Sequence, residues 1–488
     1  MSEHLKGLNS AQREAAVHVK GPLLIVAGAG AGKTKTITHR IINLIKKGVA
    51  PEKILAVTFT NKAAKEMKER IISEIEKSAK GQNSIPFVST FHSLGVYIIK
   101  ENAKILGLTK YFTILDEGDT TTLIKETLKE IGLDPKQYDP RKIKNIISRE
   151  KGNFKHYEEY QEEKNNSSAG GANYLSKIVA QVWKIYESKK AKENSLDFDD
   201  LLLKSTKLLK ENEEIRKKYQ EKWEYMHVDE YQDTNEAQYL MSRLLSEKNK
   251  NICVVGDADQ NIYSWRGANL KNILSFEKDY PNAKIILLEE NYRSTKNILE
   301  AANEVIKKNK YRPDKNLFTK NKIGEKISIY EALDESDEAE FVAKKILKIF
   351  DCFESSNFSS LRPSQSTEWD PRDQKIERFS ALKERQDIVE RTLGRSDGDG
   401  QRKFSAENFR GESYNILPEI AILYRANFQS RILEEAMLKY NIPYQVLGIK
   451  FFERKEIKDT LAYLRSALNP ESLSDIKRII NFPVRGIG

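Results

Sequence analysis

Five short apolar segments along the chain have the pattern of buried β-strands. Each is a run of mostly aliphatic, often β-branched residues that ends in a polar turn. The five segments are residues 22–28, 54–60, 224–230, 251–257 and 284–291. Such continuous runs are typical of strands covered on both faces, as in a parallel sheet. Helical patterns follow most of them, so the alternation predicts an α/β fold with a doubly wound parallel sheet and a ligand site at the carboxyl ends of its strands.

A long helical segment interrupts this alternation. From about residue 93 to residue 214 the chain shows charged helical patterns and no apolar strand run, so we interpret it as an inserted helical domain. Its segment 140–155 carries a group of basic residues, namely Arg141, Lys142, Lys144, Arg149 and Lys151. This segment either contacts nucleic-acid phosphates or forms a solvated helix face. In LDFDDLL (196–202), Asp199 and Asp200 are expected to cap the following helix.

A second α/β block is predicted after residue 291. Its strand candidates are residues 326–333, 418–425 and 444–448, and its helical patterns cover residues 337–350, 430–441 and 456–469. Residues 351–415 interrupt the block and are poor in apolar residues, so disorder or loose helix is expected there. The predicted domains are a first core (1–92 and 215–290), an inserted helical domain (93–214), a partial second core (291–469) and the start of a second helical insertion (470–488).

Charge and cysteine content narrow the class of protein. The chain has 82 Lys and Arg against 72 Asp and Glu, a net charge of +10, which fits a polyanionic partner, nucleic acid first. Cys253 and Cys352 are the only cysteines and offer neither a metal-ligand spacing nor a disulfide framework. No signal-peptide pattern opens the chain, and no apolar run approaches the ~20 residues of a membrane span. We therefore expect a cytoplasmic protein without a membrane partner.

The most specific local motif is AGAGAGKT, which follows the first strand and opens a helix. Its glycines let the backbone curl so that N–H groups point at phosphate oxygens. Lys33 is expected to reach the β- and γ-phosphates of ATP, and Thr34 to hold Mg²⁺. An ordinary glycine-rich turn is the alternative. The predicted nucleotide-binding loop comprises Ala27, Gly28, Ala29, Gly30, Ala31, Gly32, Lys33 and Thr34.

A pair of acidic residues ends another apolar strand, in HVDEYQDT. Asp229 is expected to be a direct or water-mediated Mg²⁺ ligand, and Glu230 to orient or deprotonate the attacking water. On its own such a pair is usually a helix cap or a solvated turn, and its occurrence beside a phosphate-binding loop favours the catalytic role.

Seven segments resemble, in order, the motifs of the UvrD/PcrA/Rep family of DNA helicases. They are LNSAQREA (8–15), AGAGAGKT (27–34), AVTFTNKAAKEM (56–67), VDEYQDTN (228–235), VGDADQNIYSWRGA (255–268), LEENYRST (288–295) and AILYRANFQSRILEEA (421–436). The resemblance implies RecA-like P-loop cores, ATP and Mg²⁺ as cofactors, and an enzyme that moves 3′-to-5′ on single-stranded DNA and separates strands at junctions.

The resemblance also implies roles for single residues in nucleotide binding. Gln12 would read the adenine edge, and Tyr292 would stack on the adenine ring. Gln260 would sense the γ-phosphate, and Arg293 would bond it as an electrostatic clamp. Arg40 is placed among the nucleotide-binding residues on the same basis. For Arg293 the alternative is a surface ion pair.

A second group of residues matches positions that line the family's single-strand channel. They are Phe59, Thr60, Asn61, His92, Tyr263, Trp265 and Arg266. Bases stack on aromatic faces whatever their sequence, which contributes ~1–3 kcal/mol per base. The alternatives are that the aromatic residues belong to the core and that the histidine is structural.

Two later family motifs, a TVHxSKGLE-like pattern and a γ-phosphate arginine, do not occur before the last segment, FPVRGIG (482–488). We therefore expect these residues alone to bind ATP and DNA but to hydrolyse ATP poorly. The alternatives are a non-catalytic ATP- and DNA-binding remnant, a regulatory subunit, or a subunit of a helicase–nuclease complex. Repair or replication proteins are the expected protein partners, with the pathway and the oligomeric state left open.

Overall fold

The computed structural model describes residues 3–78, 84–166, 174–309, 315–359, 419–446, 455–483 and 485–486. The chain forms two compact units. The first comprises Met1–Ile327 together with Lys455–Gly488, and the second comprises Ser328–Arg454. The predicted functional residues all belong to the first unit.

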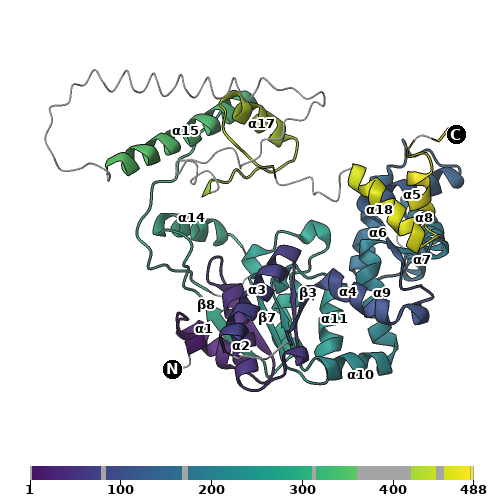
Figure 1. The fold of residues 1–488 in the computed structure, drawn as a ribbon, viewed down its shortest axis with the longest axis horizontal. Coiled ribbons are helices and arrows are strands. Elements are labelled where there is room, and N and C mark those ends of the chain that lie inside the picture. Colours follow the sequence, from purple (N-terminus) through teal and green to yellow (C-terminus); the bar gives the residue numbers. More distant parts are fainter. Residues whose placement is uncertain are drawn as a thin grey trace. The chain divides into compact units, whose positions relative to one another are not determined.

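A six-stranded parallel sheet forms the centre of the first unit (Figure 1). Its order is β3 (Phe87–Thr90), β2 (Ile54–Thr58), β6 (Tyr225–Val228), β7 (Ile252–Gly256), β1 (Leu23–Ala27) and β8 (Lys284–Leu288). Strands β1, β2 and β7 are buried at every position, which explains why their sequences do not alternate with polar residues. The predicted α/β class and its five predicted strands are confirmed, whereas β3 was not anticipated.

Helices cover both faces of the sheet, as the doubly wound prediction requires. Alternate residues of β1 point to opposite sides: Leu23 and Ile25 join one core cluster, and Leu24 and Val26 join the other. The first cluster is covered by α1 (Ser10–Val17), α2 (Lys33–Lys46) and α3 (Asn61–Ser78). The second is covered by α4 (Phe91–Glu101), α9 (Phe198–Glu211), α10 (Glu213–Lys222) and α11 (Glu236–Ser246).

The segment between α4 and α9 is helical, with a core of its own around Trp183 and Tyr186. Its helices are α5 (Glu117–Glu130), α6 (Pro140–Gly152), α7 (Tyr157–Asn166) and α8 (Tyr174–Lys192). Two very short strands, β4 (Thr113–Ile114) and β5 (Ser195–Leu196), also pair within it. The expectation of a segment without strands was therefore wrong for these residues, because a two-residue strand leaves no readable apolar run.

The helices α18 (Lys455–Leu468) and α19 (Leu473–Ile479) pack against this helical segment. The buried Asn469 side chain donates to Thr113 Oγ1 at 3.1 Å and to the Glu193 carbonyl at 3.1 Å. Lys477 forms an ion pair with Glu126 of α5 at 3.1 Å. Residues 455–483 are thus held by polar contacts, and the predicted domain boundaries at 469 and 470 stay predictions.

An ionic cluster, buried except for the partly exposed Glu187, joins α6, α8 and the start of α9. The ammonium group of Lys151 lies 2.7–2.8 Å from Glu187, Asp197 and Asp200. Lys190 lies 2.9 Å from Glu187 and 2.7 Å from Asp197. Burial opposes the charge of Lys151, but the surrounding carboxylates raise its pKa well above the ordinary value. The expectation that Lys151 belongs to a phosphate-binding or solvated helix face was therefore wrong, because carboxylates inside the protein surround its charge.

The same cluster corrects the predicted cap of α9. Asp197 is the N-cap residue, and it forms a capping box with Asp200 at the third helical position. Asp199 is not part of the cap. Its pKa is raised to about 7 by burial and by the neighbouring Asp197, against a hydrogen bond from Ser148.

Shorter elements complete the description. The remaining helices of the first unit are α12 (Lys271–Leu274), α13 (Phe276–Asp279) and α14 (Lys296–Ile306). The second unit contains α15 (Glu335–Ser359) and α17 (Gln429–Lys439), packed through a small cluster around Ala343 and Met437. The predicted helices at 337–350, 430–441 and 456–469 are confirmed. No helix in the described ranges is long and apolar enough to cross a membrane.

The strands predicted for the second core were wrong over the described residues. Residues 326–333, 419–425 and 444–446 have no strand conformation, and residues 418, 447 and 448 lie outside the described part. The segment predicted to be disordered or loosely helical at 351–415 begins as regular helix, since α15 continues to Ser359. Its remainder lies outside the described residues.

The buried ionic cluster gives the first prediction. Lys151→Met leaves three buried carboxylates with one lysine, so we expect the free energy of unfolding to fall by about 3–5 kcal/mol. Arg149→Met on the same helix is the matched control, because the Arg149 side chain is 62% exposed. Its ion pair contributes roughly 0–1 kcal/mol. Urea denaturation followed by circular dichroism measures the free energy of unfolding of both variants. Equal losses in the two would contradict the assignment of Lys151 to a buried ionic cluster.

Candidate nucleotide site and nucleic-acid interface

The phosphate-binding loop follows β1. At two of its glycines the backbone has a conformation that residues other than glycine adopt only with strain. Gly30 and Gly32 have φ angles of 69° and 80°, in the left-handed region that favours glycine. The helix α2 begins directly afterwards, at Lys33. A methyl group added at Gly28 would lie 2.2 Å from Leu317 Cδ2, so the loop is also packed closely from outside. The glycines predicted from the motif are therefore required by both conformation and space.

Three predicted catalytic residues from separate loops meet beside this loop. The Lys33 ammonium group donates to Glu230 Oε2 at 2.7 Å and to Gln260 Oε1 at 3.0 Å. Lys33 is 9% exposed, and such charge-assisted bonds are stronger than neutral ones in a desolvated setting. Residues far apart in sequence thus converge, because β1, β6 and β7 are neighbours that end at the same edge of the sheet.

Asp229 and Thr34, the two residues predicted to hold Mg²⁺, lie in direct contact. The Thr34 hydroxyl donates to Asp229 Oδ2 at 2.9 Å, and Asp229 is buried. Burial and the neighbouring Glu230 raise the pKa of Asp229 to about 6, partly opposed by the Thr34 hydrogen bond. A carboxylate whose ionised form is disfavoured by burial gains from a nearby cation. Hard oxygen donors at the start of α2 fit Mg²⁺ in chemistry.

Glu230 has an unusual backbone conformation for its residue type. Its φ and ψ angles are 51° and 45°, in the left-handed region, which costs a non-glycine residue of order 1–3 kcal/mol. The following residues, Tyr231–Asp233, form a short 3₁₀ turn. This conformation is compatible with the Glu230 carboxylate facing Lys33, so local strain accompanies the ion pair.

The segment after β8 closes over the phosphate-binding loop. The Asn291 side chain donates to the Ala29 carbonyl at 2.6 Å, and the Tyr292 N–H donates to the Gly30 carbonyl at 3.0 Å. The Tyr292 ring is 49% exposed, and its hydroxyl accepts from the Asn9 side chain at 2.8 Å. Tyr292 is therefore held next to α1, where the prediction places the adenine.

Gln12 and Arg293 both lie beside the same loop. The buried Gln12 side chain donates to the Ala31 carbonyl at 2.9 Å and accepts from the Asn9 N–H at 3.2 Å. Arg293 is exposed, and its Cβ lies 2.8 Å from where a Cβ on Gly30 would be. Among the described residues, no carboxylate lies within ion-pair distance of its guanidinium group.

Arg40 does not occupy a position suited to nucleotide binding. It is completely buried under α1, and its guanidinium group donates to the carbonyls of Ala15 and Val19 at 3.4 Å. Burial lowers the pKa of Arg40. These contacts link α2 to the end of α1, so the buried Arg40 has a structural role here in place of the nucleotide-binding role expected from the sequence.

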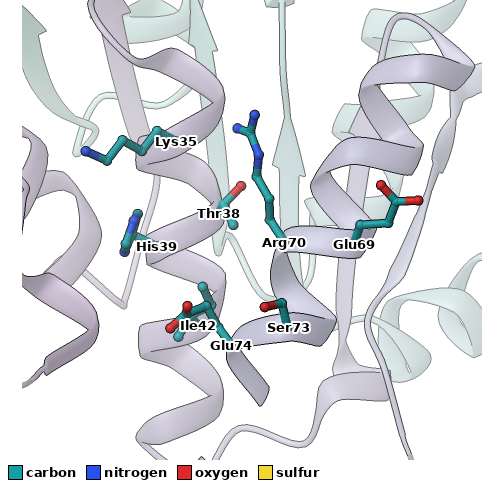
Figure 2. Close-up of a pocket in the computed structure, with 8 residues that line it drawn as sticks. All are labelled: Lys35, Thr38, His39, Ile42, Glu69, Arg70, Ser73 and Glu74. Carbon is teal, nitrogen blue, oxygen red and sulfur yellow. The ribbon is translucent and has the colours of Figure 1, made fainter. Parts of the chain in front are cut away.

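A cavity of about 380 Å³ lies between α2 and α3, next to the phosphate-binding loop. Figure 2 shows the residues that line it projecting from the two helices: Lys35, Thr38, His39, Ile42, Glu69, Arg70, Ser73 and Glu74. Lys35 follows Thr34 directly and donates to the Gly7 carbonyl at 2.8 Å. Both acidic and basic side chains line the cavity, together with Ile42, and none of the sequence motifs indicated it.

The predicted DNA-contacting aromatic residues form a row at the same edge of the sheet. The rings of Phe59 and Tyr263 are 5.1 Å apart, and those of Tyr263 and Trp265 are 6.5 Å apart. Trp265 is 72% exposed, so the alternative that it belongs to the core is wrong. Thr60 and Asn61 are exposed at the start of α3. The side chain of Arg266 lies outside the described residues.

His92 lies in the first turn of α4, just after the neighbouring strand β3, and it contacts a residue that the sequence analysis missed. Its ring packs edge-on against Phe198 with centroids 5.9 Å apart, and Phe198 is 53% exposed. Burial lowers the pKa of His92 to about 4, so its ring is neutral near pH 7. Phe198 is the first residue of α9, and its position inside LDFDDLL was the available signal.

Comparison with known proteins agrees with this arrangement. Residues 8–281 match the UvrD/REP helicase N-terminal domain, and residues 286–361 and 405–488 match the UvrD-like helicase C-terminal domain. The chain belongs to the UvrD/Rep helicase family. The resemblance seen in its seven motifs is therefore confirmed, and so is the P-loop α/β fold that it implied.

Curated members of the UvrD/Rep helicase family align along the whole chain. A protein named ATP-dependent DNA helicase PcrA from Bacillus subtilis is 46% identical over 486 residues, covering 99% of this chain and 56% of the relative. Proteins of the same name from Staphylococcus epidermidis and Staphylococcus aureus are 44% and 43% identical, each over 100% of this chain and 57% of the relative. The chain thus spans just over half the length of these relatives.

The lowered pKa of His92 gives a prediction for pH dependence. The unfolded chain binds a proton at an ordinary pKa of about 6.5, well above the folded value of about 4. The buried, neutral His92 ring therefore makes its full contribution to the free energy of unfolding above pH 6.5. That contribution is lost as the pH falls toward 4. We expect His92→Gln to reduce the loss of unfolding free energy between pH 7 and pH 5 by roughly 1–2 kcal/mol. Urea titrations at both pH values measure this, and an unchanged loss would contradict it.

Proposed function

We propose that this chain is part of an ATP-dependent DNA motor that moves 3′-to-5′ along single-stranded DNA and separates strands. The observation that carries the proposal is the meeting of Lys33, Glu230 and Gln260 at the phosphate-binding loop. The loop that contains Gln260 continues directly into two aromatic residues, the half-buried Tyr263 and the exposed Trp265. One loop therefore belongs to both the nucleotide site and the surface suited to nucleic acid. The relatives at 43–46% identity are named as ATP-dependent DNA helicases.

In the proposed reaction, Lys33 and the N–H groups of the glycine loop bind the phosphates of ATP. Glu230 accepts a proton from the attacking water, and Lys33 exchanges its carboxylate partner for a phosphate oxygen. A Mg²⁺ ion held by Thr34 and Asp229 would neutralise phosphate charge. Arg293 is exposed beside Gly30 and would stabilise charge developing on the γ-phosphate.

The adenine would be held at the other end of the loop. Tyr292 offers a half-exposed ring for stacking, and Gln12 lies against the loop at Ala31. Within the described part of the chain, Gln12 Nε2 and Oε1 each make one hydrogen bond, and each can make two, so one donor and one acceptor position are available for the base edge. These two residues together fit recognition of adenine.

The DNA strand would lie across the ends of β2, β3 and β7. Phe59, Tyr263 and Trp265 supply stacking faces, and the His92–Phe198 pair extends the aromatic surface along the sheet edge. Bases stack on such faces without regard to sequence. The net charge of +10 favours a polyanion in general. Single strands and single-strand–duplex junctions are therefore the proposed nucleic-acid partners, with repair or replication proteins as proposed protein partners.

Hydrolysis of ATP with and without single-stranded DNA tests this function directly. We expect hydrolysis that DNA stimulates, and a roughly 100- to 1000-fold loss in Lys33→Ala because a phosphate-binding charge is removed. Lys46→Ala, an exposed lysine at the end of the same helix, is the matched control and should retain wild-type rates.

We also propose that residues 1–488 alone turn over more slowly than a full-length relative, because they span 56–57% of its length. Nucleotide and DNA binding without any DNA stimulation would favour instead a non-catalytic, ATP- and DNA-binding role. Absence of nucleotide binding in the wild-type chain would overturn both the motor function and the non-catalytic binding role.

The exposed Trp265 gives a prediction for DNA affinity. Trp265→Ala removes one stacking face and should weaken single-stranded DNA binding by ~1–3 kcal/mol, or about 5- to 150-fold. The slope of affinity against salt concentration should stay unchanged, since no charge is removed. Tyr174→Ala, an equally exposed aromatic residue on α8, is the control. Fluorescence anisotropy with labelled oligo(dT) measures the DNA affinity of both variants. Equal affinities of Trp265→Ala and Tyr174→Ala would contradict the proposed interface.

A further inference from the structure

The side chain of Gln232 connects two loops of the proposed site. It is 1% exposed within the 3₁₀ turn after β6. Its Nε2 donates to Glu230 Oε2 at 2.9 Å and to Asp233 Oδ2 at 3.2 Å. Its Oε1 accepts the backbone N–H of Asp257, the first residue after β7, at 2.9 Å. One buried amide therefore joins the proposed catalytic carboxylate to the start of the β7 loop.

The structure leaves specific space for this amide. Gly256 ends β7, and a methyl group added there would lie 2.6 Å from Gln232 Oε1 and 2.9 Å from Ile273 Cδ1. The φ angle of Gly256 is not in the left-handed region, so space rather than backbone conformation requires glycine here. The backbone carbonyl of Gln232 also accepts from the Asn261 side chain at 2.6 Å. Gln232 thus holds the β7 loop at Asp257 and again at Asn261.

Two routes connect the nucleotide site to the aromatic row. The first is direct: Lys33 donates to Gln260, whose Nε2 donates to Asp257 Oδ2 at 2.6 Å. The second passes through Glu230 and the Gln232 amide to the Asp257 N–H. Both reach the loop that carries Tyr263 and Trp265, but only the second starts from the carboxylate proposed to activate water.

We propose that Gln232 is a positioning residue that couples the position of the Glu230 carboxylate to the β7 loop, and through it to the grip on single-stranded DNA. This inference rests on the proposed function. Glu230 Oε2 accepts from both Lys33 and Gln232. When Lys33 donates to a phosphate instead of to Glu230, the Gln232 amide still donates to Glu230 Oε2. Because the amide is buried, it cannot exchange its partners for water, so a shift of Glu230 is transmitted to Asp257.

The test is the linkage between nucleotide and DNA binding, which does not require turnover. Oligo(dT) affinity is measured by anisotropy with and without Mg²⁺ and a non-hydrolysable ATP analogue, and the ratio of the two dissociation constants is the coupling factor. We expect a wild-type factor of about 5 or more. Gln232→Met has a similar volume but neither donor nor acceptor, so its factor should fall toward about 1. Each separate affinity should stay within about threefold of wild type, since the Gln232 side chain is buried and bonds to protein groups.

A second variant and a control separate coupling from stability. Gln232→Glu keeps an acceptor for Asp257 but loses the donor to Glu230, so its coupling factor should fall as well. Gln220→Met is the matched control: this buried glutamine donates to the Leu244 carbonyl at 2.7 Å on α11, away from the site. It should lower the melting temperature and leave the coupling factor at the wild-type value.

The outcomes distinguish this inference from the proposed function. A wild-type coupling factor in folded Gln232→Met and Gln232→Glu would overturn the role of Gln232 while leaving the motor function intact. A loss of more than about tenfold in either separate affinity would also overturn it, since Gln232 would then act in binding or folding. A wild-type chain with neither coupling nor DNA-stimulated hydrolysis would instead overturn the proposed function.

Discussion

The parallel register of the six-stranded sheet is the constraint on which the proposed site depends. Because all paired strands run in one direction, their carboxyl ends share one edge, and the loops that follow them meet there. Neighbouring strands lie ~4.8 Å apart, so the ends of β1 and β2, three strands apart in the order, are separated by roughly 14 Å. This is close enough for a phosphate-binding loop and an aromatic row to share the loops between them.

The order of the strands divides the edge into two halves. The loops after β1 and β8 carry residues suited to nucleotide, and the segments after β2 and β3 carry Phe59 and His92, which are suited to nucleic acid. Strands β6 and β7 lie between these halves. The loops after them carry Glu230, Gln232 and Gln260. Glu230 and Gln260 accept hydrogen bonds from Lys33, and Gln232, which follows β6, accepts one from the backbone of the loop after β7. The central position of these two strands therefore explains why coupling is expected to pass through them.

Holding polar groups at this edge is energetically unfavourable by itself. Asp229 is buried with a raised pKa, Glu230 has a left-handed backbone, and Gln232 has no access to water. Each is tolerated because the strands on either side are fully buried and fix the loops in place. Unfavourable groups that persist in a rigid setting are typical of functional sites.

The sequence predicted the central strands of the sheet and one edge strand, β8, but not the other edge strand, β3. Strands β1 and β7 are continuous apolar runs because both faces are covered, so their burial is visible in composition. By contrast β3 is a four-residue edge strand, FVST, whose first two residues are only half-buried. The predicted strands of the second block have apolar runs but no strand partner among the described residues, and a run alone does not create a sheet.

Single charged residues show the same limit of sequence patterns. Lys33 was predicted correctly to lie at the phosphate-binding loop because its motif fixes its place, and the structure brings it to Glu230. Lys151 was assigned to a basic, solvent-facing helix surface but lies inside an ionic cluster formed by residues that follow it by 36 to 49 positions. Arg40 was misplaced for a similar reason, since its partners are backbone carbonyls that no motif reveals.

Hydrogen exchange of the wild-type chain, with and without Mg²⁺ and a non-hydrolysable ATP analogue, tests the central claim most directly, because it reports local stability amide by amide. If nucleotide and nucleic acid share loops at one sheet edge, the nucleotide should change exchange in residues 27–34 and also in residues 257–266, while the core of the inserted helices α5–α8 stays unchanged. A change confined to residues 27–34 would mean that the nucleotide site and the aromatic row are independent, and would contradict the claim.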